Sequence, residues 1–211
     1  MTAMSVASVF TLALQGQPVT VWDGDRVPRP LPMHRWLGVA GAADRALLSL
    51  CAGPTVDVGC GPGRMAEDLA RSGHTVLGID VLPEAVRQTL SRGVPALQRS
   101  VFDPLPGEGR WGTVLLADGN IGIGGDPVAL LERARELLAP DGRVVLDLAP
   151  WGSGISTRHV SLGTPSGRSG EFPWTLVGAD AIQAVASAAG LGEVAHHQRD
   201  ARWMAVVGAR P

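Results

Sequence analysis

Residues 55–64 have the sequence Thr-Val-Asp-Val-Gly-Cys-Gly-Pro-Gly-Arg. The apolar start of this stretch predicts a buried strand, and the residues from Met65 to Arg71 predict a helix. Between them lie three glycines that permit a tight turn and let the backbone approach a ligand where a Cβ atom would collide: Gly59, Gly61 and Gly63. A strand, a glycine-rich turn and a helix in this order are typical of nucleotide-binding α/β domains.

Three side chains near the turn bear on which ligand it binds. Asp80 ends the next apolar run, where its carboxylate can accept two hydrogen bonds from a ribose diol. Arg64 stands where the dinucleotide fingerprint requires its third glycine. Asp57 would repel a diphosphate, but it suits a ligand that carries an ammonium and a sulfonium. S-adenosylmethionine (SAM) is such a ligand, and it has no phosphate.

Residues 57–63 together with Gly78-Ile79-Asp80 resemble the signature of class I SAM-dependent methyltransferases, and the resemblance extends from about residue 54 to residue 149. It implies a Rossmann-like α/β fold with helices on both faces of a seven-stranded, mostly parallel sheet. The implied strand order is 3-2-1-4-5-7-6, with the last strand antiparallel. The implied reaction is transfer of a methyl group by in-line displacement, which leaves S-adenosylhomocysteine (SAH).

The resemblance also implies which residues hold the cofactor. Asp103 is expected to bind the adenine amino group with Phe102 or Val101 against the ring, although Asp103 could instead begin a turn before Pro104. Leu82 is expected to pack against adenine, and Asp118 or Asn120 to hold the methionine end. The complete predicted cofactor set is Asp57, Gly59, Cys60, Gly61, Gly63, Asp80, Leu82, Phe102, Asp103 and Asp118.

Composition limits the class of protein. A chain of 211 residues, 45% hydrophobic and 18% charged, suits one soluble globular domain. A net charge of −2 gives no electrostatic footprint for general nucleic-acid binding and leaves only a local basic patch open. All 18 basic residues are arginine and tyrosine is absent, which excludes a P-loop lysine, a pyridoxal Schiff base and a Tyr-x-x-x-Lys reductase. The bias toward Arg, Ala and Gly is typical of a high-GC bacterial genome.

The sequence also indicates a cellular location. Two cysteines, Cys51 and Cys60, are too few for a disulfide framework and fit a reducing compartment. Residues 1–14 are apolar but lack the basic start and the cleavage site of a signal peptide, and no run has the length of a membrane span. We therefore expect a cytoplasmic monomer or homodimer that acts on a small molecule and binds neither nucleic acid nor a membrane.

Residues 1–52 are predicted to be an N-terminal extension packed on a methyltransferase domain at residues 53–211. Valines on either side of Asp23-Gly24-Asp25 predict a β-hairpin. Helical spacing of apolar residues predicts one helix from Met33 to Cys51. The resemblance places this segment over the cofactor and one side of the acceptor, so Trp36 is either a substrate contact or a core anchor.

The segment between residues 149 and 178 is expected to build the acceptor pocket, with strands at 155–162 and 172–177. The substrate candidates are Trp36, Asn120, Trp151 and Trp174, although the tryptophans are equally well explained as core residues. An aromatic wall suits a small apolar or aromatic acceptor. His159 is the candidate general base because it lies in this segment, whereas methylation of an acidic carbon would need no base.

Other functions remain open at this point. Ala149-Pro150 stands where magnesium-dependent O-methyltransferases carry a second metal-binding pair, so we expect no metal. A SAM-binding, methyltransferase-like protein without activity is one alternative. A nicotinamide-dependent oxidoreductase is another, although Arg64 and Asp57 disfavour it.

Overall fold

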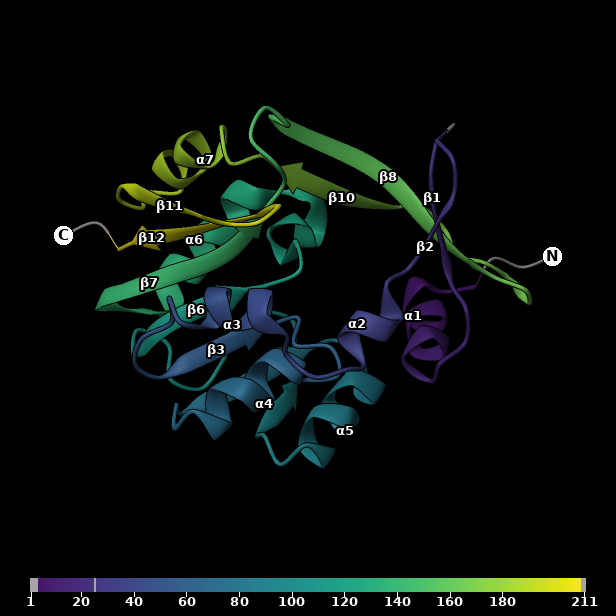
Figure 1. Ribbon diagram of the computed structural model, residues 1–211, viewed down its shortest axis with the longest axis horizontal. Helices are drawn as coiled ribbons and strands as arrows, with labels where there is room; N and C mark the ends of the chain where they lie inside the picture. The colour runs from purple at the N-terminus through teal and green to yellow at the C-terminus, as the bar shows by residue number, and fades with distance from the viewer. Residues whose placement is uncertain (1–3, 25, 210–211) are drawn as a thin grey trace.

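The computed structural model describes residues 4–24 and 26–209 (Figure 1). Its centre is a seven-stranded sheet with the order β11-β12-β7-β6-β3-β4-β5. The five strands from β7 to β5 in that order are parallel, and β12 runs antiparallel to β7. The predicted Rossmann-like topology is therefore confirmed. The strands are β3 (Thr55–Val58), β4 (Val76–Asp80), β5 (Ala96–Gln98), β6 (Trp111–Leu116), β7 (Leu138–Leu148), β11 (Val194–Arg199) and β12 (Arg202–Gly208).

Helices cover both faces of this sheet, so its central strands are apolar on both sides. Leu115 of β6 packs with residues of α3 (Ala42–Leu48) and α4 (Arg64–Arg71). Its neighbours in the strand face the opposite way and pack with α6 (Pro127–Leu137) and α7 (Ile182–Ala188). In Figure 1, α5 (Pro83–Ser91) lies beside α4 in front of the sheet.

Local signals explain where these helices begin. The Asp126 carboxylate accepts hydrogen bonds from the backbone N–H groups of Val128 and Ala129, both at 3.0 Å, and thereby caps α6. Pro83 occupies the first turn of α5, where a missing N–H costs nothing. A short 3-10 helix, η1 (Asn120–Gly125), joins β6 to α6. The starts of α5 and α6 therefore fix the loops that follow β4 and β6.

The predicted single helix from Met33 to Cys51 is wrong. The structure has two helices there, α2 (Met33–Trp36) and α3, separated by a loop that contains Gly38 and Gly41. Glycine is unfavourable inside a helix, and the Gly41 backbone N–H instead donates to the Asp44 carboxylate at 2.9 Å. The break matters for the site because it turns Asp44 inward.

A second sheet joins the N-terminal segment to the segment between β7 and α7. Its order is β10-β8-β1-β2, with β9 paired to β8, and its strands are β1 (Thr20–Asp23), β2 (Arg29–Pro30), β8 (Ile155–Thr164), β9 (Gly167–Arg168) and β10 (Phe172–Val177). The hairpin of β1 with β2 and the pairing of β10 with β8 were predicted, but the pairing of β1 with β8 was not. Asp25 of the predicted turn lies outside the described residues.

Helix α1 (Val6–Leu14) packs beneath this second sheet. Ser5 caps the helix by accepting a hydrogen bond from the Ser8 backbone N–H at 3.0 Å. Buried residues of α1 form one apolar cluster with Leu162 of β8 and Leu82 at the start of α5. The cluster therefore ties the N-terminal segment to the core. Within the described parts of the chain, no helix has the length and apolar character needed to cross a membrane.

Candidate functional site

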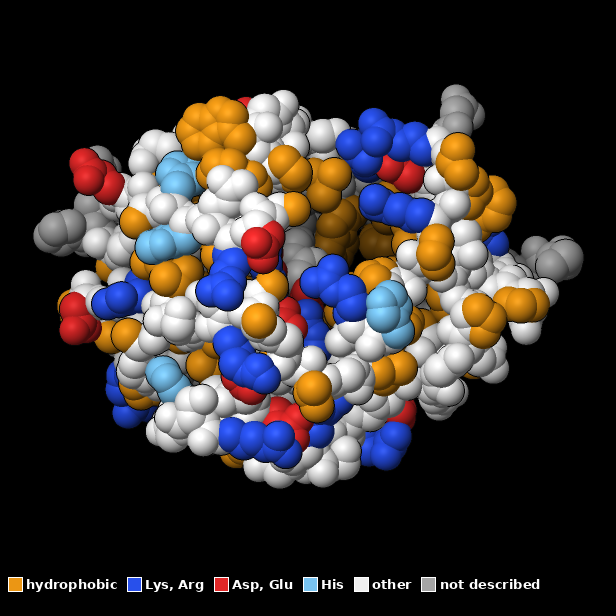
Figure 2. Space-filling model, in the orientation of Figure 1, with side chains coloured by type: hydrophobic (Ala, Val, Ile, Leu, Met, Phe, Trp, Pro, Cys, Tyr) orange, Lys and Arg blue, Asp and Glu red, His pale blue; other side chains and the backbone are white. Residues whose placement is uncertain are grey.

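A cavity of about 510 Å³ lies at the carboxyl ends of β3, β4 and β6. Helices α1 and α2 and strand β10 enclose its other side. In Figure 2 the face of the molecule is hollowed, and the deep walls of the hollow are hydrophobic. The carboxyl edge of an open α/β sheet is the general ligand site of such folds, so this cavity is the candidate active site.

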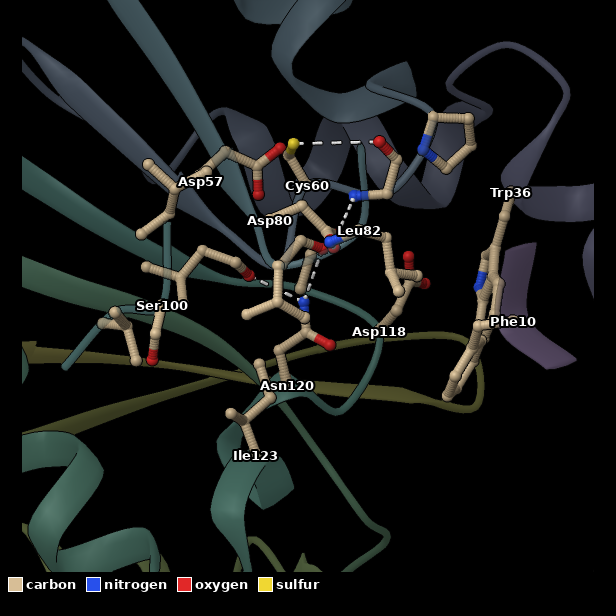
Figure 3. Close-up of a pocket in the computed structure, with 18 of the residues that line it drawn as sticks. Phe10, Trp36, Asp57, Cys60, Asp80, Leu82, Ser100, Asp118, Asn120 and Ile123 are labelled. Atoms are coloured by element: carbon tan, nitrogen blue, oxygen red, sulfur yellow. Dashed lines mark hydrogen bonds between the residues drawn. The ribbon is translucent and has the colours of Figure 1, made fainter. Parts of the chain in front are cut away.

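The glycine turn forms one wall of the cavity, and Asp80 holds it (Figure 3). The Gly61 backbone N–H donates to Asp80 Oδ2 at 3.0 Å, and the Leu82 N–H donates to Asp80 Oδ1 at 2.9 Å. Burial raises the pKa of Asp80, while the backbone hydrogen bonds from Leu82 and Gly61 oppose that rise. Asp80 thus fixes the turn and presents its remaining acceptor capacity to the cavity.

Two glycines of the turn are required by protein contacts. Gly59 has φ +67, and a Cβ there would lie 2.8 Å from Asn120 Nδ2. That nitrogen donates to the carbonyl oxygens of Val58 at 2.8 Å and Gly59 at 3.1 Å. Gly63 has φ +84, and its Cβ would lie 2.6 Å from Thr89 Oγ1 on α5. Gly61, with φ +53, has no atom within 4 Å of such a Cβ, so it alone leaves open space beside the turn.

Asp57 lies under the turn as a buried carboxyl group with an unpartnered oxygen. The residue is 1% exposed, and its Oδ2 has no hydrogen-bond partner among the described residues. Burial raises its pKa to about 7, with a further rise from the charge on Asp118 and an opposing effect of Arg64. A buried carboxylate without a partner is costly, so the site gains free energy from a cationic ligand.

A closed ring of charged side chains lies behind this wall. Arg64 donates to both carboxylate oxygens of Asp118 at 2.8 Å and lies 3.4 Å from Asp44 Oδ1. Arg202 donates to Asp44 at 2.6 Å and to both oxygens of Asp147 at 2.6 Å. Asp147 in turn accepts a hydrogen bond from the Asp118 backbone N–H at 2.7 Å.

The charges of this ring do not cancel. Two guanidinium groups face three carboxylates, so the ring carries one net negative charge when all its members are ionised. Of these side chains, Asp118 and Arg64 line the cavity. Burial raises the pKa of Asp118, although Arg64 opposes that rise. The ring therefore adds to the negative potential that Asp57 creates at this end of the cavity.

Ten of the predicted site residues line the cavity. They come from the turn, from the ends of β4 and β6, and from α2 and β10: Asp57, Gly59, Cys60, Gly61, Asp80, Leu82, Asp118, Asn120, Trp36 and Trp174. Gly63 does not line the cavity, because it faces Thr89.

Phe102 and Asp103 lie outside the cavity lining, and both are exposed. Asp103 Oδ2 accepts a hydrogen bond from the Ser100 N–H at 3.0 Å, and the Asp103 N–H donates to the Ser100 carbonyl, so the pair forms a tight turn. The residues of this loop that line the cavity are Arg99, Ser100 and Val101.

Trp151 and His159 are also outside the cavity. Trp151 is 60% exposed, and its ring packs edge-on against the His196 ring and at a tilt of 45° against the Trp203 ring. His159 is exposed on β8 opposite Pro173. All five histidines of the chain are among the described residues, and none of them lines the cavity. The structure therefore brings no imidazole to the site.

Sequence reasoning missed two groups of cavity residues. The sequence interpretation used Arg64 only as a departure from the dinucleotide fingerprint. Its position directly after the turn places it at the start of α4 and in the cavity lining. Phe10 and Leu14 line the cavity from α1. The helical spacing of apolar residues in this segment signals a buried face, but it does not indicate that the face encloses a ligand site.

Comparison with known proteins finds similarity to methyltransferases. Residues 55–142 match the family model described as a methyltransferase domain. The chain is 32% identical over 132 residues to the ubiquinone biosynthesis O-methyltransferase of Xanthomonas euvesicatoria, a stretch that covers 59% of this chain and 54% of that relative. The chain thus spans about half the length of the curated relatives it matches.

Solved structures share the fold. A SAM-dependent methyltransferase from Bacteroides fragilis in complex with SAH has a TM-score of 0.80 at 20% identity, covering 98% of this chain and 97% of its own. The 1,6-didemethyltoxoflavin-N1-methyltransferase of Burkholderia thailandensis has a TM-score of 0.55 at 19% identity, covering 79% and 77%. Over residues 55–142 the chain is therefore similar to the methyltransferase domain, and as a whole it shares its fold with SAM-dependent methyltransferases.

Proposed function

We propose that this protein is a SAM-dependent methyltransferase that acts on a small-molecule acceptor by in-line displacement. The observation that carries the proposal is the joint position of Asp80 and Asp57 on one cavity. Asp80 holds the glycine turn through Gly61, and Asp57 is a buried carboxyl group whose Oδ2 has no partner in the described parts of the chain. This pair suits a ligand that combines a ribose diol with positive charge.

The residues present fit SAM. Its adenine and ribose would lie along the turn. Asp80 would face the ribose diol, and Leu82, Ser100 and Val101 would lie near the adenine base. The Arg64–Asp118 pair would face the ammonium and carboxylate of the methionine end. When bound, SAM supplies a methyl group that its sulfonium already activates toward a nucleophile.

The protein's own contribution is to hold the two reactants together and to exclude water. Asn120 fixes the turn through Val58 and Gly59, and the ring of ion pairs fixes Asp118. Positioning of this kind supplies about 7–11 kcal/mol of barrier reduction in favourable cases. The cavity volume of about 510 Å³ supports an acceptor of small-molecule size. The names of two similar proteins also refer to small molecules. The Xanthomonas protein is named for ubiquinone biosynthesis, and the Burkholderia protein is named for 1,6-didemethyltoxoflavin.

The remaining expectations belong to the same proposal. We propose that residues 53–211 form the methyltransferase unit and that the N-terminal extension completes its acceptor side. We also propose that the protein works in the cytoplasm as a monomer or homodimer and does not bind nucleic acid.

Calorimetric titration with SAM, SAH and NADH tests the proposal. We expect Kd values near the micromolar range, about −8 kcal/mol, for SAM and SAH. Asp80→Ala should weaken both by about 10- to 100-fold because it removes a charged hydrogen-bond acceptor. The matched control is Glu132→Ala, an acidic residue exposed on α6. A folded wild-type protein that binds NADH but neither SAM nor SAH would overturn the proposal.

A further inference from the structure

The cavity has two chemically different ends. Every charged residue that lines it belongs to the segment between β3 and η1: Asp57, Arg64, Asp80, Arg99 and Asp118. The opposite end is built by α1, α2 and β10, and its described lining there carries no charge. We call this end the apolar chamber and define it by Phe10, Met33, Trp36, Phe172, Pro173 and Trp174.

Figure 3 shows this separation. Trp36 and Phe10 stand at one end of the pocket, and Asp57 and Ser100 stand at the other. Asp118 projects between the two ends in the same view. A ligand that extends from the glycine turn toward Trp36 therefore passes from a charged environment into an apolar one.

The walls of the chamber are fixed by packing. Phe10, Trp36 and Phe172 pack on an apolar cluster whose centre includes Val9 at 0% and Leu162 at 1% exposure. The rings of Phe10 and Phe172 lie 6.4 Å apart at a tilt of 57°. A preformed apolar site loses little conformational entropy when a ligand binds.

The chamber selects against charge. A phosphate, carboxylate or ammonium placed among these side chains would lose its hydration and gain no partner, which is strongly unfavourable. Apolar ring surface placed there would instead leave water and contact four aromatic side chains.

We propose that the acceptor is an uncharged, flat and largely apolar small molecule that binds in the apolar chamber. This inference rests on the proposed function, because it assigns the charged end of the cavity to SAM. The side chains of α1 and β10 in the apolar chamber would then determine which acceptors bind.

The test compares two probes with the same ring system. Protein saturated with SAH is titrated by calorimetry with 1-naphthol and with 1-naphthyl phosphate. We expect 1-naphthol to bind at least about tenfold more tightly. Equal or tighter binding of 1-naphthyl phosphate, or no binding of 1-naphthol, would overturn the proposal.

Variants locate the binding. Phe10→Gln and, separately, Phe172→Gln should weaken 1-naphthol by about tenfold or more and leave the Kd of SAH unchanged. Ile155→Gln is the matched control, because Ile155 is 53% exposed and lies outside the cavity lining. Circular dichroism verifies that each variant is folded. If both chamber variants bind 1-naphthol as the wild type does, the chamber is not its site and the proposal fails.

The titration with SAH separates the two levels of inference. If the protein binds SAH but shows no preference for 1-naphthol, the proposed function stands and only the proposed class of acceptor is rejected. If the protein binds no SAH, the proposed function is rejected, and the proposed class of acceptor is rejected with it.

Discussion

One guanidinium nitrogen of Arg64 lies 2.8 Å from both carboxylate oxygens of Asp118, a residue 54 positions further along the chain. Asp118 has φ 54, a left-handed conformation that is uncommon outside glycine. Its backbone N–H is held by Asp147, so the strained residue is fixed from both sides. Strain of this kind persists only where the surroundings enforce it, and it gathers at functional sites.

The first prediction concerns the removal of this cation. Arg64 is 3% exposed, so Arg64→Met leaves Asp118 without its partner inside the protein. We expect a loss of about 3–5 kcal/mol in the free energy of unfolding, measured by urea denaturation. The control is Arg71→Met, which removes an exposed arginine while its partner Glu67 keeps an ion pair with Arg92, so the loss should be at most about 1 kcal/mol. Equal losses in the two variants would contradict a structural role for the ring.

The second prediction concerns pH. Burial raises the pKa of Asp57 to about 7, whereas an unfolded chain has the ordinary value near 4. Between about pH 4 and pH 7 the folded protein therefore binds a proton that the unfolded chain releases. Stability falls as the pH rises through this window and stays low above it.

Asp57→Asn removes this effect. We expect the variant to be more stable than the wild type at pH 8, by about 2–4 kcal/mol, with at least half of the difference gone at pH 5. Urea denaturation at the two pH values measures it. The control is Asp141→Asn, at an exposed position of β7, which should keep the wild-type profile. A difference that does not depend on pH would show that Asp57 is ionised throughout.

The third prediction compares two glycines with nearly the same backbone. Gly63 has φ +84 and Gly73 has φ +88. A methyl group at Gly73 meets no atom within 4 Å, whereas one at Gly63 would lie 2.6 Å from Thr89 Oγ1. Gly73→Ala should cost about 1–2 kcal/mol for its backbone alone, and Gly63→Ala about 1–3 kcal/mol more. Thermal unfolding of both variants gives the difference, and equal losses would show that α5 moves aside freely.

The fourth prediction concerns the proposed base. His159 is exposed on β8 and does not line the cavity. We expect His159→Ala to keep the wild-type rate of SAH formation from SAM and acceptor. A general base typically contributes about 10²–10⁴-fold, so a fall of that size would place His159 in the reaction after all.

The charged end of the cavity was largely predictable from the sequence. The turn, Asp80 and the strand order depend on local signals, namely glycines that permit unusual backbone angles and apolar runs that mark buried strands. Residues 57–63 and Asp80 were placed at the sheet edge by these signals. The structure puts all but Gly63 of the turn glycines on the cavity.

The apolar chamber was not predictable in the same way. Phe10 lies on a short apolar helix whose pattern shows only that one face is buried. Trp151 and Trp174 have similar sequence contexts, yet Trp174 lines the cavity and Trp151 lies on the surface. The difference arises because β10 pairs with β8 and β8 pairs with β1, contacts between distant segments that periodicity does not reveal. Arg64 was similarly hidden, because its partners come from α3 and the loop after β6.

The pairing of β1 with β8 has a consequence for biosynthesis. Val21 pairs with Leu162, so β1 leaves the ribosome long before its partner is made. At about 5–20 residues per second, the delay is on the order of ten seconds. The residues that form the glycine turn and contact it, from Asp57 to Asn120, are all made before β8. The turn can therefore form on the nascent chain before the apolar chamber, whose wall from β10 requires β8 to be in place.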